Sequence, residues 1–202
     1  MERQSLIFIT GLFAVFMFCA TVCLGFYLYR NVFNSEGKGA ERKTGRTLKR
    51  FALIRRLHVL ECLELGQRDK RLVIGHLLIG SFGILLVDTM GARGEYYGQP
   101  DESNWALLCN GKRIIIENPL RRQQEAMQVI REQLAANNIY KVHMEHILHF
   151  TSASKKNQIY VNDERLIRHS KLGKYLAHTR FEQDNGIDPD RIAEILNPFA
   201  RG

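Results

Sequence analysis

The sequence predicts a mixed α/β (α+β) domain that follows a single membrane-spanning helix. Residues 4–29 carry no charged side chain, which sets them apart from the polar remainder. Beyond residue 44, a helical pattern is followed by strand-like runs, a second helix and a further strand. That order is typical of a central sheet with a helix on each side.

The N-terminal apolar run is long enough to cross a bilayer. As a helix, residues 5–29 would extend about 37 Å at about 1.5 Å per residue, and a hydrocarbon core is about 30 Å thick. A cleaved signal peptide has a shorter apolar region between a positive segment and a small-x-small site. The run is longer than that, its flank is nearly neutral and no such site follows, so we expect an uncleaved anchor over residues 1–30.

Charge predicts the orientation of this anchor. Basic residues follow the apolar run closely, whereas only Arg3 precedes it. The positive-inside rule then predicts a single-pass cell-membrane protein with its N-terminus outside and its C-terminal domain in the cytoplasm. The net charge of +8 favours nucleic acid or an anionic membrane surface as partner, and charge alone does not choose between them.

Composition divides the remainder into three parts. Residues 31–43 are charged and glycine-containing, as in a basic juxtamembrane linker. Residues 44–178 form the main domain, and residues 179–202 are expected to be a C-terminal helical extension. No CxxC motif or Cys/His zinc spacing is present, which argues against a structural zinc site.

The first half of the main domain reads as a helix and three strands. Residues 44–56 show an apolar stripe at helical spacing. Residues 57–65 are a mixed run that is compatible with a strand, and residues 71–79 are continuously apolar, like a strand buried on both faces. A glycine-rich turn leads to residues 84–89, which we expect to pair with the preceding strand as an antiparallel hairpin.

The second half begins with a loop over residues 91–104. The dipeptide Asn110-Gly111 predicts a tight hairpin between two short strands. Asn118 and Pro119 suit the cap and first position of a helix. Further elements are expected in these ranges: strands at 105–108 and 113–116, a helix to about 136, a strand at 141–150, an extended segment at 157–161, and helices at 170–178 and 189–196.

These residues resemble a known family. The stretch 73–98, then Trp105, then Asn118-Pro119-Leu120 with Gln123, is similar in order and spacing to the NERD (nuclease-related domain) family. The resemblance covers about residues 44–176. That family is considered related to the PD-(D/E)XK nucleases, so the resemblance implies a restriction-endonuclease-like α-β-β-β-α-β core.

The resemblance also implies a catalytic pattern, from which this sequence departs. Two carboxylates would hold Mg²⁺, an ion that prefers oxygen ligands, and a lysine would help to activate water. Here Gly75 stands where the first acid is expected, Asp88 replaces a glutamate, and Met90 replaces the lysine. A Gly-Glu pair in the first helix is also absent, since the nearest match is Gly45-Arg46. We therefore expect a degenerate, non-cleaving domain.

The remaining candidates would support Asp88 or contact a partner. Glu95, Asp69 and Glu61 are possible second acids, and His76 and Gln123 are possible supporting residues. Expected nucleic-acid contacts are Arg121, Arg122, Lys155 and Lys156. The leading function is therefore binding of nucleic acid or a protein partner, without a small-molecule cofactor. The alternatives are a Mg²⁺-dependent nuclease in DNA processing and a structural module at the membrane.

Histidines could suggest a metal, but their spacing does not. His143, His146 and His149 lie in a strand-like run, where His146 would point away from the other two. We interpret them as histidines on the surface of a strand. His76 lies in an apolar run and is interpreted as a satisfied core histidine. The glycines of residues 91–98 do not lead from a strand into a helix, so a dinucleotide site is rejected.

Overall fold

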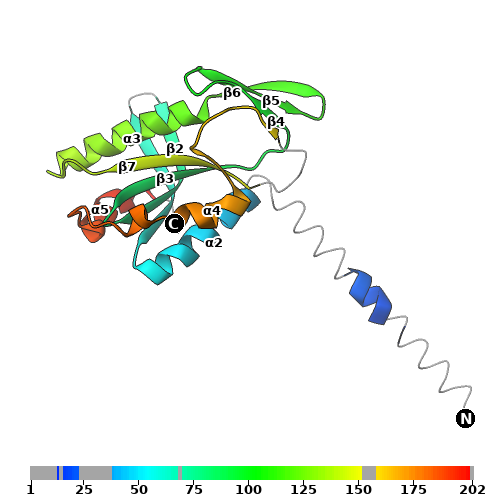
Figure 1. The fold of residues 1–202 in the computed structure, drawn as a ribbon, viewed down its shortest axis with the longest axis horizontal. Helices are drawn as coiled ribbons and strands as arrows, with labels where there is room; N and C mark the ends of the chain where they lie inside the picture. The colour runs from blue at the N-terminus through cyan, green and yellow to red at the C-terminus, as the bar shows by residue number, and fades with distance from the viewer. Residues whose placement is uncertain (1–12, 14–15, 23–37, 68–69, 152–157, 201–202) are drawn as a thin grey trace, which may run out of the picture. The chain divides into compact units, whose positions relative to one another are not determined.

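The fold is taken from a computed structural model that describes residues 13, 16–22, 38–67, 70–151 and 158–200. The chain divides at Ser35 into two units, and the fold described here is that of the second unit (Figure 1). Its architecture is mixed α+β with two sheets, which agrees with the predicted class.

The expected membrane anchor lies mostly outside the described residues. Within it, residues 16–22 are helical, and the Thr21 hydroxyl donates to the carbonyls of Met17 and Phe18 at 2.9 and 2.8 Å. In the part of the chain that the structure describes, no helix combines the length and apolar character needed to cross a bilayer.

The first helix of the main unit begins earlier than expected. Helix α2 spans Lys38–Arg55, so residues 38–43 are helical rather than part of a linker. Lysine, glutamate, arginine and alanine all favour helix, and Ala40 is buried against the domain. Within the expected helix at 44–56, Leu48 and Ala52 form the buried contact, whereas the apolar side chain of Ile54 is 75% exposed.

The main sheet has the order β1-β2-β3-β7-β9. Strands β1, β2 and β3 form an antiparallel meander, which confirms the predicted hairpin, and β7 and β9 join in parallel. The strands span His58–Gln67 (β1), Lys70–Gly80 (β2), Gly83–Met90 (β3), Met144–Phe150 (β7) and Leu166–Arg168 (β9). Strand β9 was not predicted, because so short a run shows no readable alternation.

Helices cover both faces of this sheet, as the sequence predicts. Helix α3 (Pro119–Ala136) and helix α5 (Pro189–Leu196) pack on one face. Helix α2 and helix α4 (His169–Leu176) pack on the other. In Figure 1, α3 and α2 lie on opposite sides of β3 and β7. The α-β-β-β-α-β order is therefore present, with three strands of a second small sheet inserted before α3.

The second sheet has the order β6-β5-β4-β8. It contains β4 (Glu95–Tyr97), β5 (Asn104–Cys109), β6 (Lys112–Glu117) and β8 (Gln158–Ile159). The β5–β6 hairpin turns at Asn110 and Gly111, whose φ values of 50° and 74° fit the predicted tight turn. Strand β4 lies inside the segment expected to be a loop. Short 3-10 turns at Thr179–Glu182 and Asn197–Phe199 complete the unit.

Candidate functional site around Asp88

Asp88 lies near the end of β3 on the face covered by α3. Its side chain is 7% exposed. One carboxylate oxygen, Oδ1, accepts a hydrogen bond from the backbone N–H of Gly75 at 2.8 Å. The other, Oδ2, accepts from Nη2 of Arg122 at 3.1 Å. Both oxygens of this carboxylate are therefore bound by groups of the protein itself.

Gly75 stands beside Asp88 on the neighbouring strand. The β2–β3 register pairs His76 with Val87, so Gly75 and Asp88 face each other across the ladder and share one face of the sheet. A Cβ at position 75 would lie 3.5 Å from Oδ1 of Asp88 and 3.2 Å from the Val87 carbonyl. A carboxylate at this position would therefore lie next to Asp88, and glycine provides none.

The strand next to Gly75 is locally distorted. The β1–β2 register passes from the pair Glu61–His76 to Leu63–Ile74 and omits Cys62 and Gly75. Cys62 has a φ of 50°, a left-handed conformation that is costly for a residue with a side chain. The ladder is therefore interrupted at the level of Gly75.

Arg122 supplies the positive charge at this site. It lies in the first turns of α3, after Asn118 caps the helix by accepting from the Leu120 N–H at 3.0 Å. The amide of Asn118 donates to the carbonyls of Pro100 and Glu102 at 3.0 and 2.6 Å, which ties the preceding loop to the helix. This anchorage fixes where α3 begins and so directs Arg122 toward Asp88.

Met90 and Gln123 complete the surroundings. Met90 is two residues beyond Asp88 and therefore shares its face of β3, but a thioether carries no charge and donates no hydrogen bond. Gln123 is buried, and its Nε2 donates to the Ile147 carbonyl at 2.9 Å. Its Oε1 has no hydrogen-bond partner among the described residues.

These residues do not fit a magnesium ion. Mg²⁺ needs several oxygen ligands at about 2.1 Å, whereas Asp88 pairs with a guanidinium and faces a glycine. Across the described ranges, no group of three histidine, cysteine, aspartate or glutamate side chains is placed to hold a metal. We derive no metal-dependent step for this site.

The possible second acids lie elsewhere. Glu61 pairs in register with His76, so both project from the face opposite Asp88. Glu95 belongs to the second sheet, where it accepts a hydrogen bond from the Tyr97 hydroxyl. That contact contributes most to raising the pKa of Tyr97 to about 12. The side chain of Asp69 lies outside the described residues.

His76 is buried beneath α2 but only partly satisfied. Its Nε2 lies 3.7 Å from Oε1 of Glu61, and its Nδ1 has no hydrogen-bond partner in the described structure. A Cβ at Gly45 would lie 2.8 Å from the His76 ring nitrogen, so the helix glycine makes room for this pair. Burial lowers the pKa of His76, although Glu61 and Asp88 oppose that shift.

The strand histidines point as predicted, but they are not on the surface. His146 faces α3, and its Nδ1 lies 3.1 Å from the Met127 sulfur. His149 faces α2 and is fully buried. Both side chains are covered because β7 is an interior strand with helices on both faces. Only His143, which precedes the strand, is exposed, and it lies 3.0 Å from Glu145.

A chain of hydrogen bonds surrounds His149. The Thr89 hydroxyl donates to the Thr44 hydroxyl at 2.8 Å, which lies 2.7 Å from Nδ1 of His149. Nε2 of His149 lies 3.1 Å from Nδ1 of His169. Burial, together with the neighbouring His169 and Lys43, lowers the pKa of His149 to about 3. This network joins α2, β3, β7 and α4 through neutral polar groups.

The predicted basic contacts separate in the structure. Arg122 lies on Asp88, whereas Arg121 is more exposed and donates to the Ser103 hydroxyl at 2.8 Å. Lys155 and Lys156 lie outside the described residues. The ion pair of Arg122 was missed by sequence reasoning. The position of Asn118 could have indicated it, because the residue at which the helix begins determines which of its side chains face the sheet.

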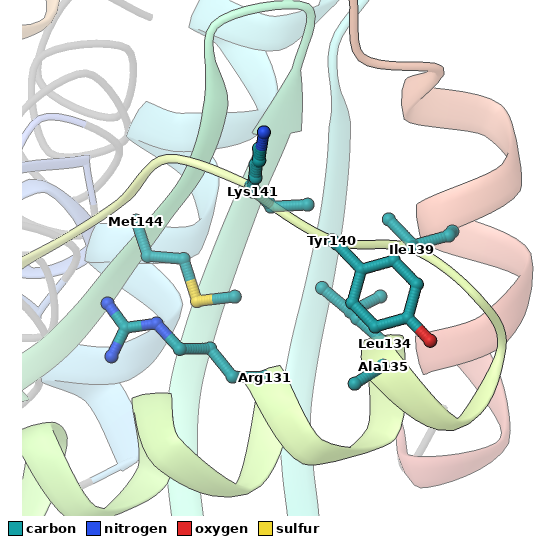
Figure 2. Close-up of a pocket in the computed structure, with 8 residues that line it drawn as sticks. Arg131, Leu134, Ala135, Ile139, Tyr140, Lys141 and Met144 are labelled. Carbon is teal, nitrogen blue, oxygen red and sulfur yellow. The ribbon is translucent and has the colours of Figure 1, made fainter.

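A separate cavity of about 360 Å³ lies at the far end of α3. Figure 2 shows its lining from the helix and from the segment that leads into β7. Arg131 is nine residues beyond Arg122, or about 14 Å along a helix at about 1.5 Å per residue. The cavity is therefore separate from the Asp88 site.

Comparison with known proteins gives one match. The family model for the nuclease-related domain, NERD, matches residues 36–151, which is more than half of the chain. No curated protein and no solved structure matches significantly. The matched region includes α2, the β1–β3 meander, Asp88, α3 and β7. The chain therefore belongs to the nuclease-related domain (NERD) family.

Proposed function

We propose that this protein is a membrane-tethered nuclease-related domain that binds nucleic acid without cleaving it efficiently. The observation that carries the proposal is the ion pair between Arg122 and Asp88. A guanidinium is permanently charged and cannot take the part of a metal that activates water. Gly75 and Met90 supply neither a second oxygen ligand nor a cation.

Support for nucleic-acid binding comes from the exposed side of α2. Arg42, Arg46 and Arg50 are spaced four residues apart and are all exposed. Residues with this spacing lie on one face of a helix, so the three guanidinium groups form a basic strip. Contacts of arginine with phosphate supply much of the affinity of proteins for nucleic acid. The net charge of +8 acts in the same direction.

The proposed tether is the uncharged run over residues 5–29, with the domain in the cytoplasm. Its support is the length of the run and the basic residues that follow it. Fusing a reporter that is active only in the cytoplasm to the C-terminus tests this orientation. We expect activity in the membrane fraction, and activity that is absent there or found in the soluble fraction contradicts the tether.

Filter binding of labelled DNA and RNA to the full-length chain in detergent tests the binding function. We expect log K to fall linearly with log salt, with a slope of about −0.9 for each phosphate contacted on duplex DNA. Changing Arg42, Arg46 and Arg50 to Gln should reduce that slope by about one unit for each arginine that binds a phosphate. The matched control changes Arg131, Lys171 and Lys174, which are exposed elsewhere, to Gln.

Two outcomes separate this proposal from its alternatives. Absence of binding at low salt would indicate a protein partner or a structural role instead. Mg²⁺-dependent cleavage by the wild type that disappears in Asp88→Ala would falsify the non-cleaving assignment. The cleavage assay uses the same preparation and the same nucleic acids as the binding assay.

A further inference from the structure

Strand β6 forms one edge of the second sheet and, among the strands that the structure describes, pairs with β5 alone. The strand is apolar at its centre, and Ile114 and Ile115 are 48% and 60% exposed. An exposed apolar edge strand presents backbone N–H and C=O groups to which another strand can pair. Charged residues, Lys112 and Glu117, stand at its two ends.

The hairpin geometry determines which backbone groups point outward. The turn at Asn110-Gly111 closes on the pair Cys109–Lys112, and two-residue turns close on a hydrogen-bonded pair. Antiparallel ladders then alternate, so the even-numbered residues of β6 bond to β5. The bond from the Asn118 N–H to the Ser103 carbonyl, 2.9 Å long, continues this alternation. The backbone groups of residues 113, 115 and 117 therefore point away from β5.

We propose that β6 pairs with β6 of a second copy of this chain, antiparallel and centred on Ile115. In that register the two Ile115 residues face each other across a two-fold axis. Arg113 lies opposite Glu117 of the second copy, and the converse pair forms on the other side of the axis. These side chains share one face of the sheet, so opposite charges flank an apolar centre.

Other registers lack one of these features. If the second copy is shifted by an odd number of residues, backbone N–H and C=O groups that point away from β5 in one copy lie opposite groups that point toward β5 in the other. The ladder of hydrogen bonds then cannot form. A shift by an even number of residues places Arg113 opposite Ile115, opposite the other Arg113 or beyond the strand, so neither charge pair forms. Backbone geometry and side-chain charge therefore select the same register. Because β6 is complementary to itself in this way, a second copy is the partner that the strand fits.

Sedimentation equilibrium of the full-length chain in density-matched detergent tests the proposal. We expect self-association of the wild type that Ile115→Pro weakens at least tenfold. Proline removes the outward-pointing N–H and is tolerated on an edge strand where that group faces solvent. Circular dichroism verifies that the variant remains folded. The control Lys171→Glu, which changes the charge on α4, should leave association unchanged.

A charge exchange tests the register itself. Arg113→Glu and Glu117→Arg should each weaken association, because each places like charges opposite one another, and the double variant should restore it. In a separate measurement, Ile115→Cys should form an oxidised dimer more readily than Leu53→Cys, a position that is 85% exposed on α2. A wild type that stays monomeric, a dimer that survives Ile115→Pro, or a double variant as weak as the single variants overturns the proposal.

Discussion

Asp88 is the residue on which the chemistry of the site depends. Its carboxylate is nearly buried and is held by two donors, the Gly75 amide and the Arg122 guanidinium. A buried charge is costly unless it is paired and hydrogen-bonded. In this ion pair the negative charge of Asp88 is balanced by the guanidinium of Arg122. Because the carboxylate is already paired, it is not available to bind a metal ion, and this accounts for the proposed lack of metal chemistry.

Removing the cation should destabilise the protein, and its effect should be coupled to that of removing Asp88. Arg122→Leu leaves Asp88 with only the Gly75 donor, and we expect a loss of about 1–3 kcal/mol in the free energy of unfolding. Combining it with Asp88→Asn should cost less than the sum of the two changes. Urea titration of the full-length chain measures this. Arg121→Leu is the control, with an expected loss within about 0.5 kcal/mol. Strict additivity would show that the pair does not interact.

The buried histidines should make stability depend on pH. Burial lowers the pKa of His149 to about 3 and that of His146 to about 4, whereas unfolded histidine titrates near about 6.5. As the pH falls, the unfolded chain therefore binds protons before the folded protein does. The free energy of unfolding is fully present above about pH 6.5 and decreases as the pH falls toward the pKa values of the folded state.

This dependence can be measured between about pH 6.5 and 5, above the range where most carboxylates titrate. Each histidine contributes a slope of at most about 1.4 kcal/mol per pH unit. His149→Gln should flatten the dependence, because it removes a group whose folded pKa is lowered. A slope that His149→Gln leaves unchanged would mean that His149 is not the group responsible.

At the scale of elements, the start of α3 organises the site. Pro119 and Asn118 determine where the helix begins, and Asn118 also holds the loop that precedes β5. The indole Nε1 of Trp105 donates to the Gln99 carbonyl at 2.9 Å and fastens the same loop. The Asn-Pro-Leu segment and the tryptophan of the family resemblance thus have structural roles that position Arg122.

Loss of this anchor should be costly. Asn118→Ala removes the helix cap and the donors to two loop carbonyls, and we expect about 1–3 kcal/mol of destabilisation. Asn137→Ala, at the other end of α3, removes one exposed bond to Gln133 and should cost within about 0.5 kcal/mol. Thermal unfolding monitored by circular dichroism compares the two. Equal losses would show that Asn118 does no more than an ordinary surface residue.

The elements with clear local signals were predictable. Helix α3 spans the expected residues, because Asn118 and Pro119 mark its start, and the β2–β3 and β5–β6 hairpins follow from their turns. Strands β4 and β9 were missed, because their three-residue runs depend on pairing rather than on a pattern of their own. The burial of His146 and His149 was also missed, because it depends on which strand lies inside the sheet.

At the scale of the whole molecule, the fold agrees with the family, whereas the loss of catalysis is our proposal. The helices and strands of the nuclease-related core are present and in order, and their packing does not need the acids and the lysine. The side chains at positions 75 and 90 supply neither an oxygen ligand nor a cation, which is why we propose that the domain does not cleave efficiently. The sequence could reveal these replacements, but the pairing of Arg122 with Asp88 required the structure.

The most direct test is a titration of Mg²⁺ into the full-length protein, in which isothermal calorimetry measures the heat of binding. We expect no binding to the wild type at millimolar Mg²⁺. A variant with Gly75→Asp and Arg122→Gln should gain binding, because it adds a second carboxylate beside Asp88 and removes the competing cation. Binding of Mg²⁺ by the wild type that Asp88→Ala abolishes would contradict the account.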